Sequence, residues 1–174
     1  MAENLNVSHF QNGNTIGEVR TNEEWKEYGE KGIPAWCYYD NNPANGEKYG
    51  KLYNWFAVIH SRVLTPKGWH IPGDNEWIML INHLGGFTLA GEKLAYKPEK
   101  PITAIYQIGF NALPGGYRKS DGFFGYLGKC GFWWSNTESI PEGAWGWYMY
   151  FNNHDVNRGC FNKKSGFSIR CLRG

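Results

Sequence analysis

The sequence predicts a single α+β domain of 174 residues. Capping signals for two short helices stand in its first half, whereas the last third is typical of strands joined by short turns. The 23 glycines and the aromatic content of 17% favour turns and irregular strands over a helical bundle. A chain of this length buries enough surface to fold as one domain without disulfides or a structural metal. We therefore expect residues 1–174 to form one domain.

The first predicted helix begins after a capping box. The hydroxyl of Thr21 and the carboxylate of Glu24 can each accept a free backbone N–H at a helix start. We therefore expect a helix over 22–29, which the glycines at 29 and 32 end.

The second predicted helix has the clearest apolar spacing. Gly73 or Asp74 can cap it, and apolar residues then recur at 77, 80, 81 and 84. Two glycines at 85 and 86 should end it. We expect a helix over 74–84, with Trp77 buried on its inner face and Trp69 buried nearby.

The rest of the chain is assigned to strands and loops. Residues 40–50 are rich in turn-forming types, and 51–60 is expected to be a buried strand because of its aromatic and β-branched content. Residues 86–131 are expected to be mostly loop. Strands are expected at 35–39, 131–137, 144–151, 155–161 and 165–172, mostly antiparallel and with the two chain termini close together.

Charge and hydropathy exclude some partners. The net charge is only +2 and no basic stripe is present, so we expect no nucleic-acid partner. No stretch approaches the apolar run needed to span a bilayer, so we expect no direct membrane insertion. The first residues, Met1 to Asn4, lack the features of a secretory signal peptide. The oligomeric state is left open.

Several phrases stand in a fixed order along the chain. They are Glu3-Asn-Leu5, Tyr49-Gly-Lys-Leu-Tyr-Asn-Trp55, Gly68-Trp-His-Ile-Pro72, Glu76-Trp77, Phe110-Asn-Ala-Leu-Pro-Gly-Gly-Tyr-Arg118, Trp133-Trp-Ser135, Thr137-Glu138, Ala144-Trp145 and Gly166-Phe-Ser-Ile-Arg-Cys171. In this order they resemble a known family, the Fibrobacter succinogenes major paralogous domain, and the resemblance extends from Glu3 to Arg173.

The resemblance implies a C-type-lectin-like fold and a place at a cell surface or in a phage virion, since the family is abundant in Bacteroidetes surface proteins and their phages. The group is similar to formylglycine-generating-enzyme domains and to the variable proteins of diversity-generating retroelements. In those variable proteins, a rigid scaffold displays diversified side chains for non-enzymatic binding. We therefore expect a recognition domain for a protein or glycan ligand, outside the cell.

The candidate binding residues lie in the last third, where large aromatic and small polar residues alternate with apolar ones. This mixture is typical of binding loops. The candidates are Trp147, Tyr150, Asn152, Asn153, His154, Asp155, Asn157, Cys160 and Asn162. Their neighbours are expected to be buried, namely Trp145, Met149, Phe151 and Val156.

Structural roles compete with binding at these positions. Asn152 and Asn153 suit an ordinary hairpin turn equally well. Trp133, Trp134 and Trp145 are more typical of a core. On a regular strand the side chains at 147 and 150 point to opposite faces, so a bulge would be needed for both to join one site.

No catalytic or metal-binding pattern stands out. The histidines show no metal-ligand spacing, and no catalytic residue is assigned. Oxygen-bearing side chains between Asp40 and Glu47 suit calcium, although turns of this composition are common without it. A purely structural module and a degenerate formylglycine-type enzyme remain as alternatives, and neither a cofactor nor a metal is expected.

The four cysteines form no zinc motif. The family resemblance implies a cysteine just before the Pro-x-Gly-Trp-His phrase that pairs with the C-terminal one. Thr65 occupies that position here, so Cys171 lacks its usual partner. We expect Cys171 to be buried and unpaired, like a small apolar residue, with all four thiols free.

Overall fold

The computed structural model describes residues 1–96 and 109–174. Its elements follow the chain in this order: β1 (Gly17–Glu18), α1 (Asn22–Glu30), β2 (Ala35–Cys37), the 3-10 turn η1 (Tyr39–Asn41), α2 (Pro43–Tyr49), β3 (Leu52–Tyr53), α3 (Trp55–Val58), β4 (Trp69–His70), α4 (Asp74–His83), α5 (Phe87–Leu94), β5 (Gly115–Arg118), β6 (Phe124–Leu127), β7 (Cys130–Ile140), β8 (Gly143–Tyr150), β9 (Val156–Asn162) and β10 (Leu172–Arg173). The predicted α+β class is confirmed.

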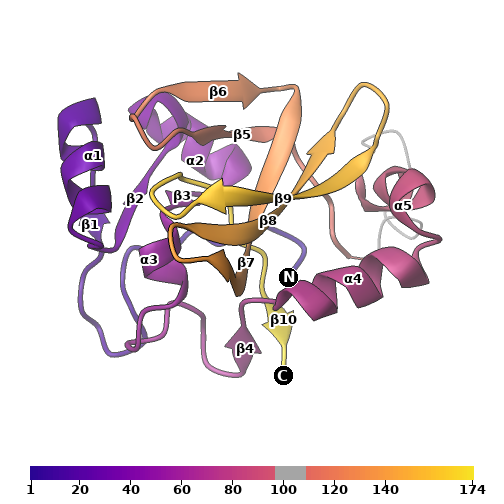
Figure 1. Cartoon of the computed structure of the whole chain (residues 1–174), viewed down its shortest axis with the longest axis horizontal. Coiled ribbons are helices and arrows are strands. Elements are labelled where there is room, and N and C mark those ends of the chain that lie inside the picture. The colour runs from indigo at the N-terminus through magenta and orange to yellow at the C-terminus, as the bar shows by residue number, and fades with distance from the viewer. Residues whose placement is uncertain (97–108) are drawn as a thin grey trace.

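The strands form three sheets. The largest has five strands in the order β6-β5-β7-β8-β9, and two smaller ones have the orders β1-β2-β3 and β10-β4. Figure 1 shows the five-stranded sheet in the middle, α1 at one end and α4 with α5 at the other. Pairing along β7, β8 and β9 is antiparallel, as predicted, but β5 joins β7 in parallel at Gly116 and Gly131, so the large sheet is mixed.

Both predicted helices are present. Thr21 and Glu24 form the reciprocal capping box before α1. Gly73 is the N-cap of α4, and the carboxylate of Glu76 accepts the backbone N–H of Gly73 at 2.8 Å. Trp77 is 3% exposed on the inner face of α4, as predicted. Trp69 is only partly buried, so its predicted burial was overstated.

The expectation of two helices was wrong, because the described residues contain three more. Asn42 caps α2 by accepting the N–H of Ala44, and Pro43 follows at the first helical position, so 40–50 is not all turn. Asn54 caps α3 in the same way within the stretch expected to be a strand. Residues 86–131 are not mostly loop, since α5, β5 and β6 lie there.

The segment 165–172 was expected to be a strand, but in its first part it forms single bridges between sheets. Phe167 exchanges two backbone hydrogen bonds with Tyr53 of β3, and the N–H of Ser168 donates to Phe132 of β7. This part of the chain therefore joins the β1-β2-β3 sheet to the five-stranded sheet. Only the last residues of the segment enter a strand, β10.

The chain termini lie together, as predicted. The Met1 ammonium donates to the carbonyl of Cys171 at 2.7 Å. Beside them, the core is divided by the large sheet. One cluster around Trp134 and Phe167 lies between the sheets, and another around Trp77 lies between the large sheet and the helices α4 and α5.

Candidate functional site

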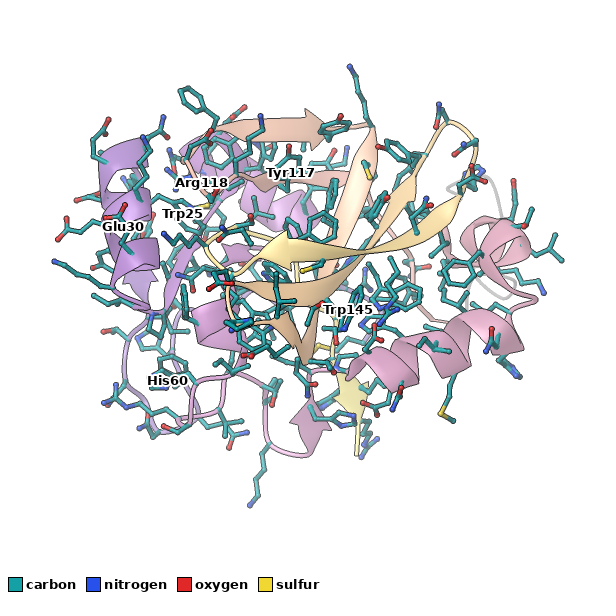
Figure 2. The ribbon with its side chains drawn as sticks, viewed as in Figure 1. Trp25, Glu30, His60, Tyr117, Arg118 and Trp145 are labelled. Atoms are coloured by element: carbon teal, nitrogen blue, oxygen red, sulfur yellow. The ribbon has the colours of Figure 1, made fainter. Side chains whose placement is uncertain are left out.

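The two faces of β8 carry different chemistry. Trp145, Trp147 and Met149 alternate with Tyr148 and Tyr150, so the two sets point to opposite sides of the sheet. The tryptophan side meets α4 and α5, and the tyrosine side belongs to the concave face of the large sheet. Figure 2 labels one residue from each side, Trp145 near α4 and Tyr117 near β5.

Trp147 is not exposed, which corrects the sequence prediction. Its side chain is 1% exposed and stacks on Trp77, with ring centroids 5.8 Å apart and planes inclined by 14°. The indole Nε1 donates to Asp74 at 3.1 Å. Trp147 therefore packs β8 against α4, because the regular pleat sends it to the face opposite Tyr150.

Trp145 was expected to be buried and is only partly so. The Arg158 guanidinium lies over its ring, 3.4 Å from guanidinium carbon to ring centroid. Arg158 also donates through Nε to Asp74 Oδ1 at 2.8 Å and contacts Oδ2 through Nη2 at 2.6 Å. Sequence analysis missed this arginine, because only the pairing of β8 with β9 places it opposite Trp147 on this face.

Four candidates form the turn between β8 and β9. Asn153 donates to the Asp155 carboxylate at 2.6 Å and accepts the Asp155 N–H at 3.1 Å. His154 has a left-handed backbone, with φ at 59°, and its Nδ1 lies 3.1 Å from Glu92 of α5. Asn152 is exposed. These contacts are those of a hairpin turn, which was the structural alternative.

The remaining candidates lie in separate places along β8 and β9. Asn157 pairs with Tyr148 and shares the concave face with Tyr150. Cys160 is exposed on the tryptophan side, whereas Asn162 lies at the end of β9, where its side chain accepts the N–H of Lys164. The candidates therefore do not form one cluster. Met149 and Val156 are buried as predicted, and Phe151 is only partly so.

The structure instead gathers partly exposed aromatic rings on the concave face of the large sheet, which we call the aromatic face. Phe132 and Phe167 lie beneath it, 6% and 1% exposed. Sheet curvature brings a ring of β6 to within contact of one on β8, although β5 and β7 lie between them in the strand order. The aromatic face consists of Tyr117, Tyr126, Tyr148, Tyr150 and Phe161.

The hydroxyls of these four tyrosines form no hydrogen bond with any described residue. The buried Tyr53, by contrast, donates its hydroxyl to the Val7 carbonyl at 2.7 Å. Burial and neighbouring tyrosines raise the pKa of Tyr117 and of Tyr150 above the ordinary value, so both stay protonated at neutral pH. The aromatic face therefore offers uncharged groups that can both donate and accept hydrogen bonds.

Tyr126 reaches this face from a strained backbone. Its φ is +66°, a conformation that is uncommon for a bulky residue, and its side chain is 45% exposed. A strained residue persists only where surrounding contacts offset its energetic cost, and such residues are enriched at functional sites. Here those contacts are rings, since Tyr126 lies 5.7 Å from Tyr117 and 6.2 Å from Phe132, centroid to centroid.

Polar residues in the sequence phrases have structural partners. Asn4 Oδ1 accepts from Trp133 Nε1 at 3.0 Å and from Arg170 Nε at 3.1 Å. Arg118 is fully buried and donates to the carbonyls of Val19, Thr21 and Gly122. In Figure 2, Arg118 lies beside Trp25, and the guanidinium carbon is 4.5 Å from the indole centroid.

Buried Arg170 has backbone partners in place of a carboxylate. It donates to the carbonyls of Met1, Phe110 and Asn111, and burial lowers its pKa to about 9. The two buried arginines thus tie loops together through their rigid, multiply donating guanidinium groups. These phrases encode the scaffold.

All four cysteines are free, and Cys171 is fully buried, as predicted. Burial raises the pKa of Cys37 and of Cys130 to about 12, and that of Cys171 to about 11. These three thiols are therefore unreactive at neutral pH. Cys160 is the exposed one.

The side chains considered for calcium hold their own loop. Asn42 Oδ1 caps α2, and Asn41 donates to the carbonyl of Arg20 at 2.7 Å. The described residues contain no group of three or more His, Cys, Asp or Glu side chains placed to hold a metal ion. None of the described helices is long and apolar enough to cross a membrane.

A comparison with protein families places the chain. The family described as the Fibrobacter succinogenes major domain matches residues 1–173. The chain belongs to this family. No curated protein and no solved structure matches it significantly. The Fibrobacter succinogenes major domain thus includes the whole chain, and the phrases that carry the resemblance are the ones whose side chains hold its termini, loops and sheets together.

Proposed function

We propose that the chain is a non-catalytic recognition domain of the C-type-lectin-like kind that binds a protein or glycan ligand through the aromatic face. The observation that carries this proposal is the set of four tyrosine hydroxyls without a partner in the described residues, on rings that are partly exposed. Asn4, Arg118 and Arg170 of the scaffold have partners, whereas the aromatic face combines unused hydroxyls with partly exposed apolar surface.

The rings are held before any ligand arrives. Tyr148 lies 5.9 Å from Tyr150 and 5.8 Å from Phe161, and Tyr126 lies 6.3 Å from Tyr150, all within the range of aromatic contact. A surface whose rotamers are fixed loses little entropy on binding. Tyrosine is favoured in binding surfaces because it adds large contact area at low entropic cost.

The architecture also supports the lectin-like part of the proposal. Its adjacent termini, its two capped helices α1 and α4 and its long antiparallel pairing of β7, β8 and β9 agree with the α+β architecture expected from the sequence. The proposed setting is a cell surface or a phage virion, outside the cell.

Diversification by a retroelement is a finer proposal for the same domain. Asn152, Asn153 and Asp155 are exposed in the β8–β9 turn, where changes would not disturb the core. The buried Trp147 does not belong to such a set. A template repeat and a reverse-transcriptase gene beside the coding sequence would support diversification, and their absence from the complete locus would count against it.

Binding can be tested with two collections of ligands, a glycan array and a displayed peptide library. The wild-type domain is compared with the variant Tyr148→Ala/Tyr150→Ala and with the control Phe123→Ala, whose ring is 60% exposed and lies outside the aromatic face. We expect binding in at least one collection, kept by the control and lost by the double variant. If no ligand binds, or if the double variant binds as well as wild type, the structural-module alternative is preferred.

A further inference from the structure

The rings of the aromatic face contact one another. Tyr126, Tyr150, Tyr148 and Phe161 follow in a row, with successive centroids 6.3, 5.9 and 5.8 Å apart and planes inclined by 66°, 83° and 85°. An aromatic cage for an ammonium group holds the cation over several ring faces at once. Rings already in mutual contact cannot enclose a cation, so a ligand must lie along the row.

Phe161 packs over two glycines of the sheet. A Cβ built on Gly146 would come within 2.8 Å of the ring, and one on Gly159 within 3.1 Å, so the ring occupies the space above these glycines on neighbouring strands. The ring is partly exposed. Such a ring is a platform for a flat, partly apolar ligand.

The polar groups along the row can both donate and accept hydrogen bonds. The tyrosine hydroxyls donate and accept. Asn157 lies opposite Tyr148 on the next strand; its Nδ2 donates to the Asp155 carbonyl at 3.3 Å, and its Oδ1 accepts no hydrogen bond from a described residue. All of these groups are uncharged, so nothing in the row selects for an anionic or cationic ligand.

We propose that the aromatic face binds a neutral oligosaccharide, whose sugar rings lie along Tyr126, Tyr150, Tyr148 and Phe161 while its hydroxyls pair with the tyrosine hydroxyls and Asn157. The inference rests on the proposed function and names its ligand class. A sugar has apolar C–H faces for stacking and hydroxyls that both donate and accept. A proline-rich peptide also suits aromatic surfaces, but its prolines have no N–H to give to an acceptor such as Asn157 Oδ1.

Three variants of the full chain test the proposal. Tyr148→Phe/Tyr150→Phe keeps the packing and removes two hydroxyls. Tyr126→Gly removes a ring and relieves the positive φ at the same position, so it should fold with a Tm close to that of wild type. Met79→Ala is the control, because Met79 is 70% exposed on α4, away from the large sheet's concave face.

Affinity gel electrophoresis is run with three neutral soluble polysaccharides, a β-glucan, a xylan and a mannan, and tryptophan fluorescence is used to titrate poly-L-proline. We expect at least one polysaccharide to retard wild type and Met79→Ala equally. The dissociation constant should rise by about tenfold in Tyr126→Gly, the loss typical of an aromatic anchor, and by a smaller factor in the double Phe variant.

Three outcomes overturn the sugar proposal: no retardation by any of the three polysaccharides, equal retardation of wild type and Tyr126→Gly, or saturable binding of poly-L-proline alone. Failure here is separable from failure of the proposed function. If the displayed peptide library yields binders that depend on Tyr148 and Tyr150 while no polysaccharide binds, the recognition function stands and the sugar assignment falls.

Discussion

At the scale of single residues, Trp77 packs α4 against the large sheet. Its indole is 3% exposed and contacts the rings of Phe110, Trp133 and Trp147. We predict that Trp77→Ala lowers the free energy of unfolding by about 3–5 kcal/mol, through lost apolar contact and the cavity left behind. Urea denaturation measures it. The exposed Met79→Ala on the same helix should stay within about 0.5 kcal/mol of wild type.

The four cysteine thiols should differ in how readily an alkylating reagent reaches them in the folded protein. Alkylation under denaturing, non-reducing conditions should label all four thiols, because none is paired. In the native protein we predict rapid labelling of Cys160 alone, since burial protects Cys37, Cys130 and Cys171. Mass spectrometry counts the labels. Two intact disulfides in the denatured sample would contradict this prediction.

The buried thiols also make stability depend on pH in the alkaline range. The Cys37 thiol has a pKa of about 12 in the folded chain against 9.0 for the ordinary value. Below pH 9 both states keep the proton, and its contribution is constant. Above pH 9 the unfolded chain releases the proton and the folded chain does not, so stability falls by up to about 1.4 kcal/mol per pH unit for this thiol. We predict a shallower fall for Cys37→Ala in denaturation series from pH 9 upward. Equal slopes would show that Cys37 ionises equally in both states.

At the scale of elements, α5 is held against the β8–β9 turn by a glycine. A Cβ on Gly91 would lie 1.7 Å from the His154 carbonyl oxygen and 3.2 Å from Met149 Sδ. Because the first of these atoms belongs to the backbone, no side-chain rotation relieves the clash. We predict that Gly91→Ala costs about 1–3 kcal/mol despite the better helix propensity of alanine. Thermal unfolding measures the loss, and hydrogen exchange should rise in α5 first. Leu89→Ala, at an exposed position of the same helix, is the control.

At the scale of the whole molecule, Asn4 connects the beginning of the chain to its end. Its side-chain oxygen accepts from Trp133 and Arg170, which lie 129 and 166 residues away in sequence. We predict that Asn4→Ala costs about 2–4 kcal/mol, because a buried guanidinium and an indole N–H lose their acceptor. Denaturant unfolding measures it against Asn6→Ala, an exposed asparagine two residues on. A cost below that of the control would mean that Met1, Phe110 and Asn111 suffice to hold Arg170.

Local signals predicted the elements that local chemistry controls. The capping box at Thr21 and the apolar spacing from Trp77 gave α1 and α4, and alternation with short turns gave β7, β8 and β9. The same kind of signal was present for α2 and α5 but was outweighed, in α2 by the turn-forming composition around Asn42 and Pro43, and in α5 by flanking glycines. At Phe87, Ala90, Gly91 and Leu94 the helical spacing is visible in the sequence.

The sequence by itself determined the α+β class and the two capped helices, because caps and periodicity act over a few residues at a time. The order of phrases along the whole chain determined the family and, through it, the expectation that Cys171 is unpaired. Only the tertiary structure decided which side chains of β8 and β9 face solvent. A strand pattern separates two faces but does not say which one a helix will cover. Trp147 was therefore predicted to be exposed although α4 covers its side of β8, and Trp145, on the same side, is only partly buried. The aromatic face depends on the same distant pairing: it draws rings from β5, β6, β8 and β9, and curvature of the folded sheet brings them together.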